Sequence, residues 1–143
     1  MQSQESNASD PLLKPTLYAP VGNARPGARC LLKGGACACG YVFFPFQAFG
    51  CERCGRSGND VQPSTLSSHG VLIARVEVHV HQGLRTAPFV IGAIQLDAGP
   101  VVRTLLLEDQ GTLPAGCEVE AVLTDAQTAQ GAQVLDLRFA ARS

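Results

Sequence analysis

Tryptophan is absent from this sequence of 143 residues, methionine occurs once, and aromatic residues make up only 6% of it. Charged residues are also few, at 16%, and 11 Lys and Arg against 12 Asp and Glu give a formal net charge of −1. A chain so close to neutral has no global field that attracts nucleic acid or an anionic membrane. Its length allows one ordinary domain or two very small ones, and excludes a multidomain enzyme with its own large cleft.

Several functional segments are also missing. No stretch approaches the ~18 apolar residues of a membrane-spanning helix. The N-terminus, MQSQESNASDPLLKPTLYAP, lacks a basic region followed by an apolar run, so we find no secretory signal. No Ser-His-Asp, paired-carboxylate or phosphate-loop pattern stands out. We therefore expect a cytoplasmic protein without catalytic residues of its own, while a hydrophobic content of 45% predicts a folded core.

Cysteine, in contrast, is abundant, with six residues in this short chain. In a reducing compartment, clustered cysteines indicate metal binding or chemistry before disulfides. Four of them form two close pairs, Cys-x-Cys-Gly and Cys-x2-Cys-Gly, and four soft thiolate ligands favour zinc over iron. We predict a structural zinc ion bound by Cys37, Cys39, Cys51 and Cys54.

The details of this site leave alternatives. The first pair departs from the usual Cys-x2-Cys knuckle, so Cys30 is a rival for Cys37 as fourth ligand. Gly40 and Gly55 follow the pairs, where a residue without Cβ lets each knuckle turn back and direct N–H groups at sulfur. A redox site at 51–54 would need a strand-to-helix setting that the sequence does not show. A catalytic zinc is disfavoured because four thiolates close the coordination shell.

Aromatic and basic side chains gather around the cysteines. Five of the eight aromatic residues lie between the two pairs, namely Tyr41, Phe43, Phe44, Phe46 and Phe49. They either wrap the metal site or form a docking surface for a partner, and the two roles are compatible. Residues 25–56 carry five basic side chains against one acidic, a formal +4, or +2 with a zinc tetrathiolate. This excess is either solvated surface charge or an anion site for a phosphate-bearing ligand, for which the candidates are Lys33, Arg53 and Arg56.

The C-terminal half reads as a β domain. Alternation or apolar runs predict strands at 76–81, 88–97, 101–107, 117–123 and 133–140, and Gly92 is expected to mark a bulge or sharp bend. Five short strands favour a small Greek-key barrel of the OB type, although an SH3-like barrel or a sandwich would give nearly the same pattern. His79 and His81 fall on the polar face of their strand, and Cys117 on the apolar face of its own.

The expected organisation is thus mainly β and has four parts. Residues 1–29 are expected to form an extended N-terminal arm, and 30–58 a rubredoxin-like zinc ribbon. A linker is expected at 59–69, followed by a five-stranded OB-fold barrel at 70–143.

The sequence also resembles a known family, the acyl-CoA-associated proteins that combine a zinc ribbon with an OB fold and were long catalogued as a domain of unknown function. The resemblance covers residues from about 30 to 141 and rests on GACACGYVFFPFQAFGCERCG, HGVLIARVEVH, APFVIGAIQLDAG, LPAGCEVEAVL and LRFAA. Members are non-catalytic partners of thiolase-superfamily proteins that act on CoA thioesters. The short N-terminal lead and FGCERCG resemble, within this family, the small subunits of benzoylsuccinyl-CoA thiolases of anaerobic toluene degradation.

This resemblance implies a structural zinc, a hetero-oligomer with a thiolase-like subunit, and a CoA thioester shared with that subunit. The catalytic cysteine and histidines would belong to the partner, with this ribbon as a clamp and the barrel as a docking surface. The family's N-terminal helical region is short or missing here. The competing class is a nucleic-acid-binding OB protein with a zinc ribbon. A formal charge of −3 over residues 70–143, with Phe89 and Phe139 as the only aromatics there, disfavours it.

Overall fold

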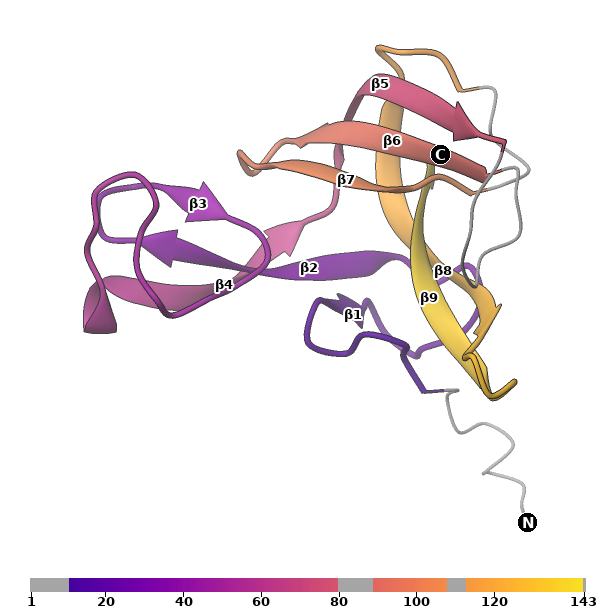
Figure 1. The fold of residues 1–143 in the computed structure, drawn as a ribbon, viewed down its shortest axis with the longest axis horizontal. Helices are drawn as coiled ribbons and strands as arrows, with labels where there is room; N and C mark the ends of the chain where they lie inside the picture. Colours follow the sequence, from indigo (N-terminus) through magenta and orange to yellow (C-terminus); the bar gives the residue numbers. More distant parts are fainter. Residues whose placement is uncertain (1–10, 80–88, 108–112, 143) are drawn as a thin grey trace.

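The computed structural model describes residues 11–79, 89–107 and 113–142 (Figure 1). Within these ranges the chain forms two antiparallel β-sheets and a short 3-10 helix, with no α-helix. The predicted mainly β fold class is confirmed. No helix in these residues is long and apolar enough to cross a membrane.

The first sheet is built on one long strand, β2 (Cys30–Cys37). It pairs with β1 (Tyr18–Pro20) and β3 (Val42–Phe43), and from Leu31 to Cys37 with β4 (Val61–Ser67). The 3-10 helix η1 (Gly58–Asp60) leads into β4. The stretch 59–69 is therefore not a linker as predicted. Its mostly polar strand is an edge strand that buries only Val61 and Leu66, so it lacks the alternation by which strands are identified.

The second sheet is the predicted barrel (Figure 1). Its strands lie in the order β7-β6-β5-β8-β9. A parallel bridge between Leu106 and Phe139 brings the two edges together, so the sheet is a nearly closed five-stranded barrel. The five strands are β5 (Gly70–Val78), β6 (Phe89–Leu96), β7 (Val101–Leu105), β8 (Glu118–Gln127) and β9 (Gln133–Ala141). They overlap the five predicted segments, although Val80 and His81 lie outside the described residues.

The barrel differs from expectation at Gly92. This residue pairs regularly with Arg75, and the register shift between Leu72 and Ala74 of β5 lies across from Ile94 and Ala93. A Cβ at Gly92 would lie 2.8 Å from a methyl of Leu106 and 2.9 Å from one of Leu72. The expected bulge is therefore in β5, and glycine at position 92 makes room for the barrel core.

The outer half of β5 also differs from the prediction. Alternation suggested that its valines are buried, yet Val76 is 62% exposed. Pairing of β5 with β8 is confined to Gly70 and Val71, and Leu72 bonds the backbone of Gly116 and Cys117 just before β8. Beyond Leu72, β6 is the only strand that pairs with β5 among the described residues. In this outer part of β5, the alternating sequence therefore does not correspond to a buried face.

The N-terminal segment, which we define as residues 11–29, bonds to the backbones of the barrel strands β8 and β9. Leu13 and Pro11 exchange backbone hydrogen bonds with Leu135 of β9 at 2.9 Å, and Gly27 and Ala28 do so with Leu123 of β8 at 2.8 and 2.9 Å. Within it, Tyr18 is only 2% exposed and shares one apolar core with the first sheet and the barrel. The domain boundaries at 29 and 70 stay predictions, because the packing crosses both.

Candidate metal centre

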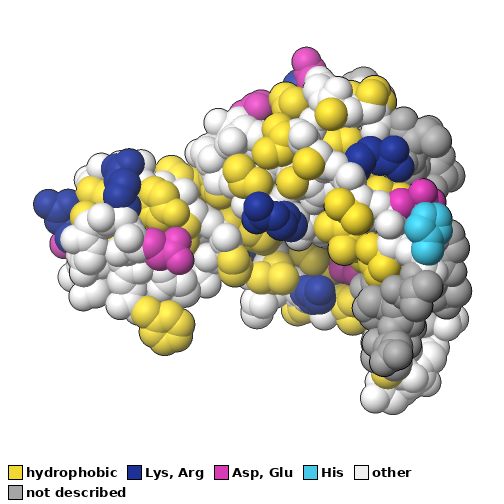
Figure 2. Space-filling view, turned by 45° about the horizontal axis from the view of Figure 1, so that its top comes forward, with side chains coloured by type: hydrophobic (Ala, Val, Ile, Leu, Met, Phe, Trp, Pro, Cys, Tyr) yellow, Lys and Arg dark blue, Asp and Glu magenta, His cyan; other side chains and the backbone are white. Residues whose placement is uncertain are grey.

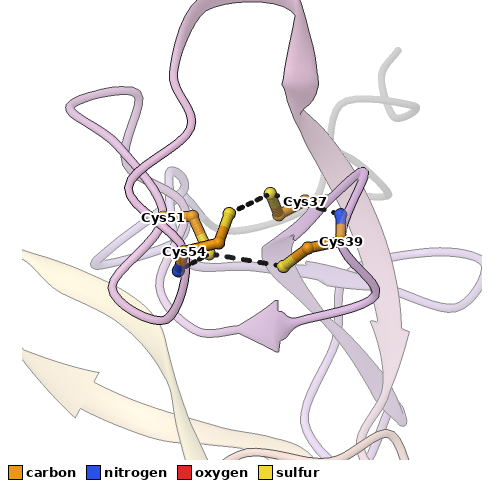
Figure 3. A group of neighbouring side chains, drawn as sticks. All are labelled: Cys37, Cys39, Cys51 and Cys54. Carbon is orange, nitrogen blue, oxygen red and sulfur yellow. Dashed lines mark hydrogen bonds between the residues drawn. The ribbon is translucent and has the colours of Figure 1, made fainter.

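The four cysteines predicted as ligands converge at the far end of the first sheet (Figure 3). Cys37 ends β2, and Cys39 lies in the following turn, while Cys51 and Cys54 belong to the second knuckle. All four Sγ atoms lie within 4.8 Å of one another. The Sγ atoms of Cys37 and Cys54 are 3.5 Å apart, and those of Cys39 and Cys51 are 3.7 Å apart. A tetrahedral zinc with Zn–S bonds of ~2.3 Å has sulfur–sulfur edges of ~3.8 Å, so the geometry fits that ion.

The two glycines turn the knuckles as expected. Gly40 has φ +99° and Gly55 has φ +82°, both in the region that favours glycine. Their N–H groups donate to the carbonyls of Cys37 at 2.9 Å and Cys51 at 2.8 Å. Each turn is thereby closed over its first cysteine.

Backbone N–H groups also point at the sulfur atoms. The N–H groups of Arg53 and Cys54 both lie 3.4 Å from Cys51 Sγ, and that of Arg56 lies 3.4 Å from Cys54 Sγ. The N–H of Cys39 lies 3.5 Å from Cys37 Sγ. Such donors stabilise thiolates, which are the form that binds a metal.

The four thiols cannot all ionise easily without a cation. The N–H of Tyr41 favours the thiolate of Cys39 and, despite burial, the pKa of Cys39 is lowered to about 6. The N–H of Cys39 likewise favours the thiolate of Cys37, but burial and the neighbouring thiols outweigh it and raise the pKa of Cys37 to about 12. A dication between the sulfurs would compensate the repulsion that keeps Cys37 protonated.

Two of the predicted ligand-binding cations lie against this cluster. The Nη2 atom of Arg53 donates to the carbonyl of Cys39 at 2.8 Å and lies 3.6 Å from its Sγ. The Nη1 atom of Arg56 lies 3.7 Å from Cys54 Sγ. The third candidate, Lys33, donates from Nζ to the carbonyl of Pro15 at 2.7 Å. The structure thus gives each cation a partner within the chain and does not bring the three together, so their role in binding a phosphate-bearing ligand stays a prediction.

Cys30, the rival ligand, lies elsewhere. It is 2% exposed in the core shared by the sheets, where burial and then the charge of Asp136 raise the pKa of its thiol to about 12. Cys117 packs against the same core and is only partly buried. The structure therefore groups Cys37, and not Cys30, with the other three cysteines.

The five aromatic residues between the knuckles have different environments. Phe43 is buried, and its ring stacks between Tyr41 and Phe46 at centroid distances of 6.0 and 6.3 Å. These three pack with the cysteines in a small separate core. Phe44 packs instead against the main core, and Phe49 is 94% exposed. Tyr41, Phe43 and Phe46 therefore pack around the cysteine cluster, whereas the ring of Phe49 does not.

One polar group was missed by the sequence analysis. Asp136 and Arg138 alternate with apolar residues on β9, a pattern typical of the solvent side of a strand, yet they are only 6% and 8% exposed. The N-terminal segment covers them, and Tyr18 donates a hydrogen bond to Asp136. The Asp-x-Arg pair on one strand face could have indicated this network, because the two side chains can pair their charges and hydrogen bonds with each other when buried.

No protein-family model and no curated protein matches the sequence significantly. Among solved structures, the chain is similar to one described as "Ltp2-ChsH2(DUF35) aldolase", with a TM-score of 0.55 and 20% sequence identity. The match covers 76% of this chain and 84% of that one. At this identity the likeness shows a shared fold.

Proposed function

We propose that this chain is a non-catalytic subunit of a thiolase-superfamily complex that acts on acyl-CoA thioesters. The observation that carries the proposal is the combination of a four-cysteine ribbon and a five-stranded barrel in one chain. This chain shares its fold with a protein of the Ltp2-ChsH2(DUF35) aldolase. The family resemblance of the sequence supports the same assignment. The finer proposal is the small subunit of a benzoylsuccinyl-CoA thiolase.

In this proposal the metal is structural. Cys37, Cys39, Cys51 and Cys54 would hold zinc, which supplies the link between two knuckles that have a very small apolar core. Four thiolates leave the ion no open position for a substrate. The chain's contribution to the complex is therefore a rigid surface, with the CoA thioester shared with the partner.

Phe49 is the proposed anchor of that surface. Its ring is 94% exposed, and its loop is held by Gln47, whose Oε1 accepts from the N–H of Phe49 at 2.6 Å and of Gly50 at 3.2 Å. The Nε2 of Gln47 donates back to the carbonyl of Gly50 at 2.8 Å. A large apolar side chain on a loop that is already ordered loses little entropy when a partner covers it. We propose Tyr41, Phe43, Phe44 and Phe46 as the support beneath this contact.

The test is a binding titration between the zinc-loaded chain and the thiolase-like protein of the same genome. Phe49→Ala is expected to weaken association at least tenfold, about 1.4 kcal/mol, because anchor residues carry much of the binding energy. Val21→Ala, at another exposed apolar side chain, is the matched control and should bind as the wild type does. No binding by the wild type, together with salt-sensitive binding to single-stranded DNA, would instead favour the nucleic-acid class.

A further inference from the structure

A cavity of about 180 Å³ lies between the N-terminal segment, Phe44, and strands β7 and β9. It is somewhat larger than the engineered cavity of ~150 Å³ that binds benzene in another protein. Apolar side chains form much of its wall, among them Leu17, Leu32, Phe44, Val102, Leu137 and Phe139. Figure 2 shows basic side chains on either side of a hollow in this central region, with acidic atoms inside it.

The polar part of the wall is a buried network of Tyr18, Asp136 and Arg138. Tyr18 donates from its hydroxyl to Asp136 Oδ1, Arg138 Nη1 donates to Oδ2, and the N–H of Leu137 donates to Oδ1, each at 2.8 Å. Both oxygens of Asp136 are thus engaged, and its charge is balanced by Arg138. This carboxylate is a poor site for a cationic ligand.

The guanidinium of Arg138 still has donors to offer. Its Nη1 also donates to the carbonyl of Leu137 at 2.8 Å, but no hydrogen bond joins its Nε or Nη2 to another described residue. The residue is only 8% exposed, and a buried donor left without a partner is costly. A bound acceptor in the cavity would satisfy it.

Two further cations make the cavity positive. Lys14 and Arg103 also line it, and neither forms an ion pair with another residue in the described ranges. Among the lining residues that the structure describes, Asp136 is the only acidic one and is balanced by Arg138, so the charges of Lys14 and Arg103 are in excess. Positive charge beside an apolar wall suits a ligand that is anionic at one end and apolar at the other.

We propose that this cavity binds an anionic group, a carboxylate or a phosphate, attached to a short apolar chain or ring. Arg138 donates to the anion from within the cavity, and Lys14 and Arg103 attract it at the entrance. The apolar part of the ligand packs against Phe44 and Phe139. The site belongs to this chain alone and does not depend on the proposed thiolase-like partner.

The experiment is a titration of the zinc-loaded full chain with three probes, followed by backbone amide NMR shifts. Hexanoate has the charge and the apolar tail, 1-hexanol has the tail alone, and inorganic phosphate has the charge alone. Hexanoate is expected to shift the amides of Leu137 and Phe139 and to bind about tenfold more tightly than hexanol. Tighter binding of phosphate than of hexanoate would identify a phosphate ester as the ligand class.

Variants assign the charge effect. Arg103→Gln and Lys14→Gln should each weaken hexanoate binding severalfold, whereas Arg142→Gln, at an exposed arginine paired with Glu118 and absent from the lining, should not. Arg138→Lys keeps a cation beside Asp136 but removes the guanidinium donors, and its thermal melting shows whether it folds. The proposal is overturned if neither anion shifts these amides, if hexanol binds as well as hexanoate, or if Arg103→Gln and Lys14→Gln bind as the wild type does.

Discussion

Arg53 and Arg56 illustrate how a single residue acts on the metal centre. Both guanidinium groups lie within 3.7 Å of a cysteine sulfur and offset part of the charge of a zinc tetrathiolate. Because such outer contacts typically contribute 10–100-fold to metal affinity, Arg53→Gln and Arg56→Gln should lose zinc to a competing chelator about tenfold more readily. Arg25→Gln, an equal charge change away from the cluster, is the control. Zinc retention equal to that of the wild type in both variants would show that the two contacts are incidental.

Tyr18 is a second residue with a measurable effect. Burial opposes ionisation of Asp136, but hydrogen bonds from Arg138, Tyr18 and the N–H of Leu137 outweigh it and lower the pKa of that carboxyl. The resulting stability is present above the carboxyl's unfolded pKa and is lost as pH falls through its lower folded pKa. Tyr18→Phe should therefore destabilise the protein at pH 7 by about 1–3 kcal/mol in urea unfolding and move the NMR titration of Asp136 upward. An unchanged titration would show that the hydroxyl does not stabilise the carboxylate.

Residue types explain which of these sites were predictable. The cysteine pairs could be read from sequence because ligand chemistry and short spacing are local, and the structure groups the same four side chains. Tyr18 lies more than a hundred positions before Asp136 and Arg138, so local spacing could indicate the Asp-x-Arg pair but not the tyrosine that covers it. For the same reason, the cations around the cavity were missed, whereas Arg53 and Arg56 were singled out for a ligand role on charge alone.

At the scale of elements, closure of the barrel depends on Gly92. A methyl group there would press on Leu72 and Leu106, both almost fully buried. Gly92→Ala should therefore lower the free energy of unfolding by about 1–3 kcal/mol, as overpacking of a core does. Ala93→Ser also adds one heavy atom, at the next position of β6, where the side chain is only partly buried, and it serves as the control. Equal stability of Gly92→Ala and the wild type would contradict the proposed tight packing.

The ribbon and the barrel should respond differently to metal removal. The apolar cluster beside the four cysteines consists of few residues and is separate from the main core. Cys54→Ser or chelation should therefore abolish the binding of about one zinc per chain and expose the amides of the knuckles and β3 to hydrogen exchange. The strands β6, β8 and β9 should keep their protection. Loss of protection throughout the barrel would contradict this separation.

Elements were predictable where one face of a strand is apolar. Alternation on β8 and β9 and apolar runs on β6 and β7 indicated these strands at the positions where the structure has them. The same patterns did not indicate β4, whose exposed residues are Gln, Pro, Ser and Thr, because the position of this strand depends on backbone pairing with β2. The same limit applies to β5, where alternation continues beyond the part that covers a core.

At the scale of the whole molecule, the N-terminal segment unites the two sheets. Its β1 pairs with β2, while residues 11–13 and 27–29 bond the backbones of β9 and β8. Proline and polar residues in this segment predicted an extended arm, but they gave no sign of its backbone hydrogen bonds to the barrel, because such bonds do not depend on the side chains. The result is that the ribbon, with exposed Phe49 at its far end, is presented from a single continuous core.

We propose that this core presents the ribbon to a thiolase-like subunit. The most direct test is coexpression of the chain with the thiolase-superfamily protein of the same genome, followed by size exclusion with light scattering. We predict one hetero-oligomeric peak that contains both chains and about one zinc per copy of this chain, weakened by Phe49→Ala. Two independent peaks, each with the mass of its separate component, would contradict this proposal.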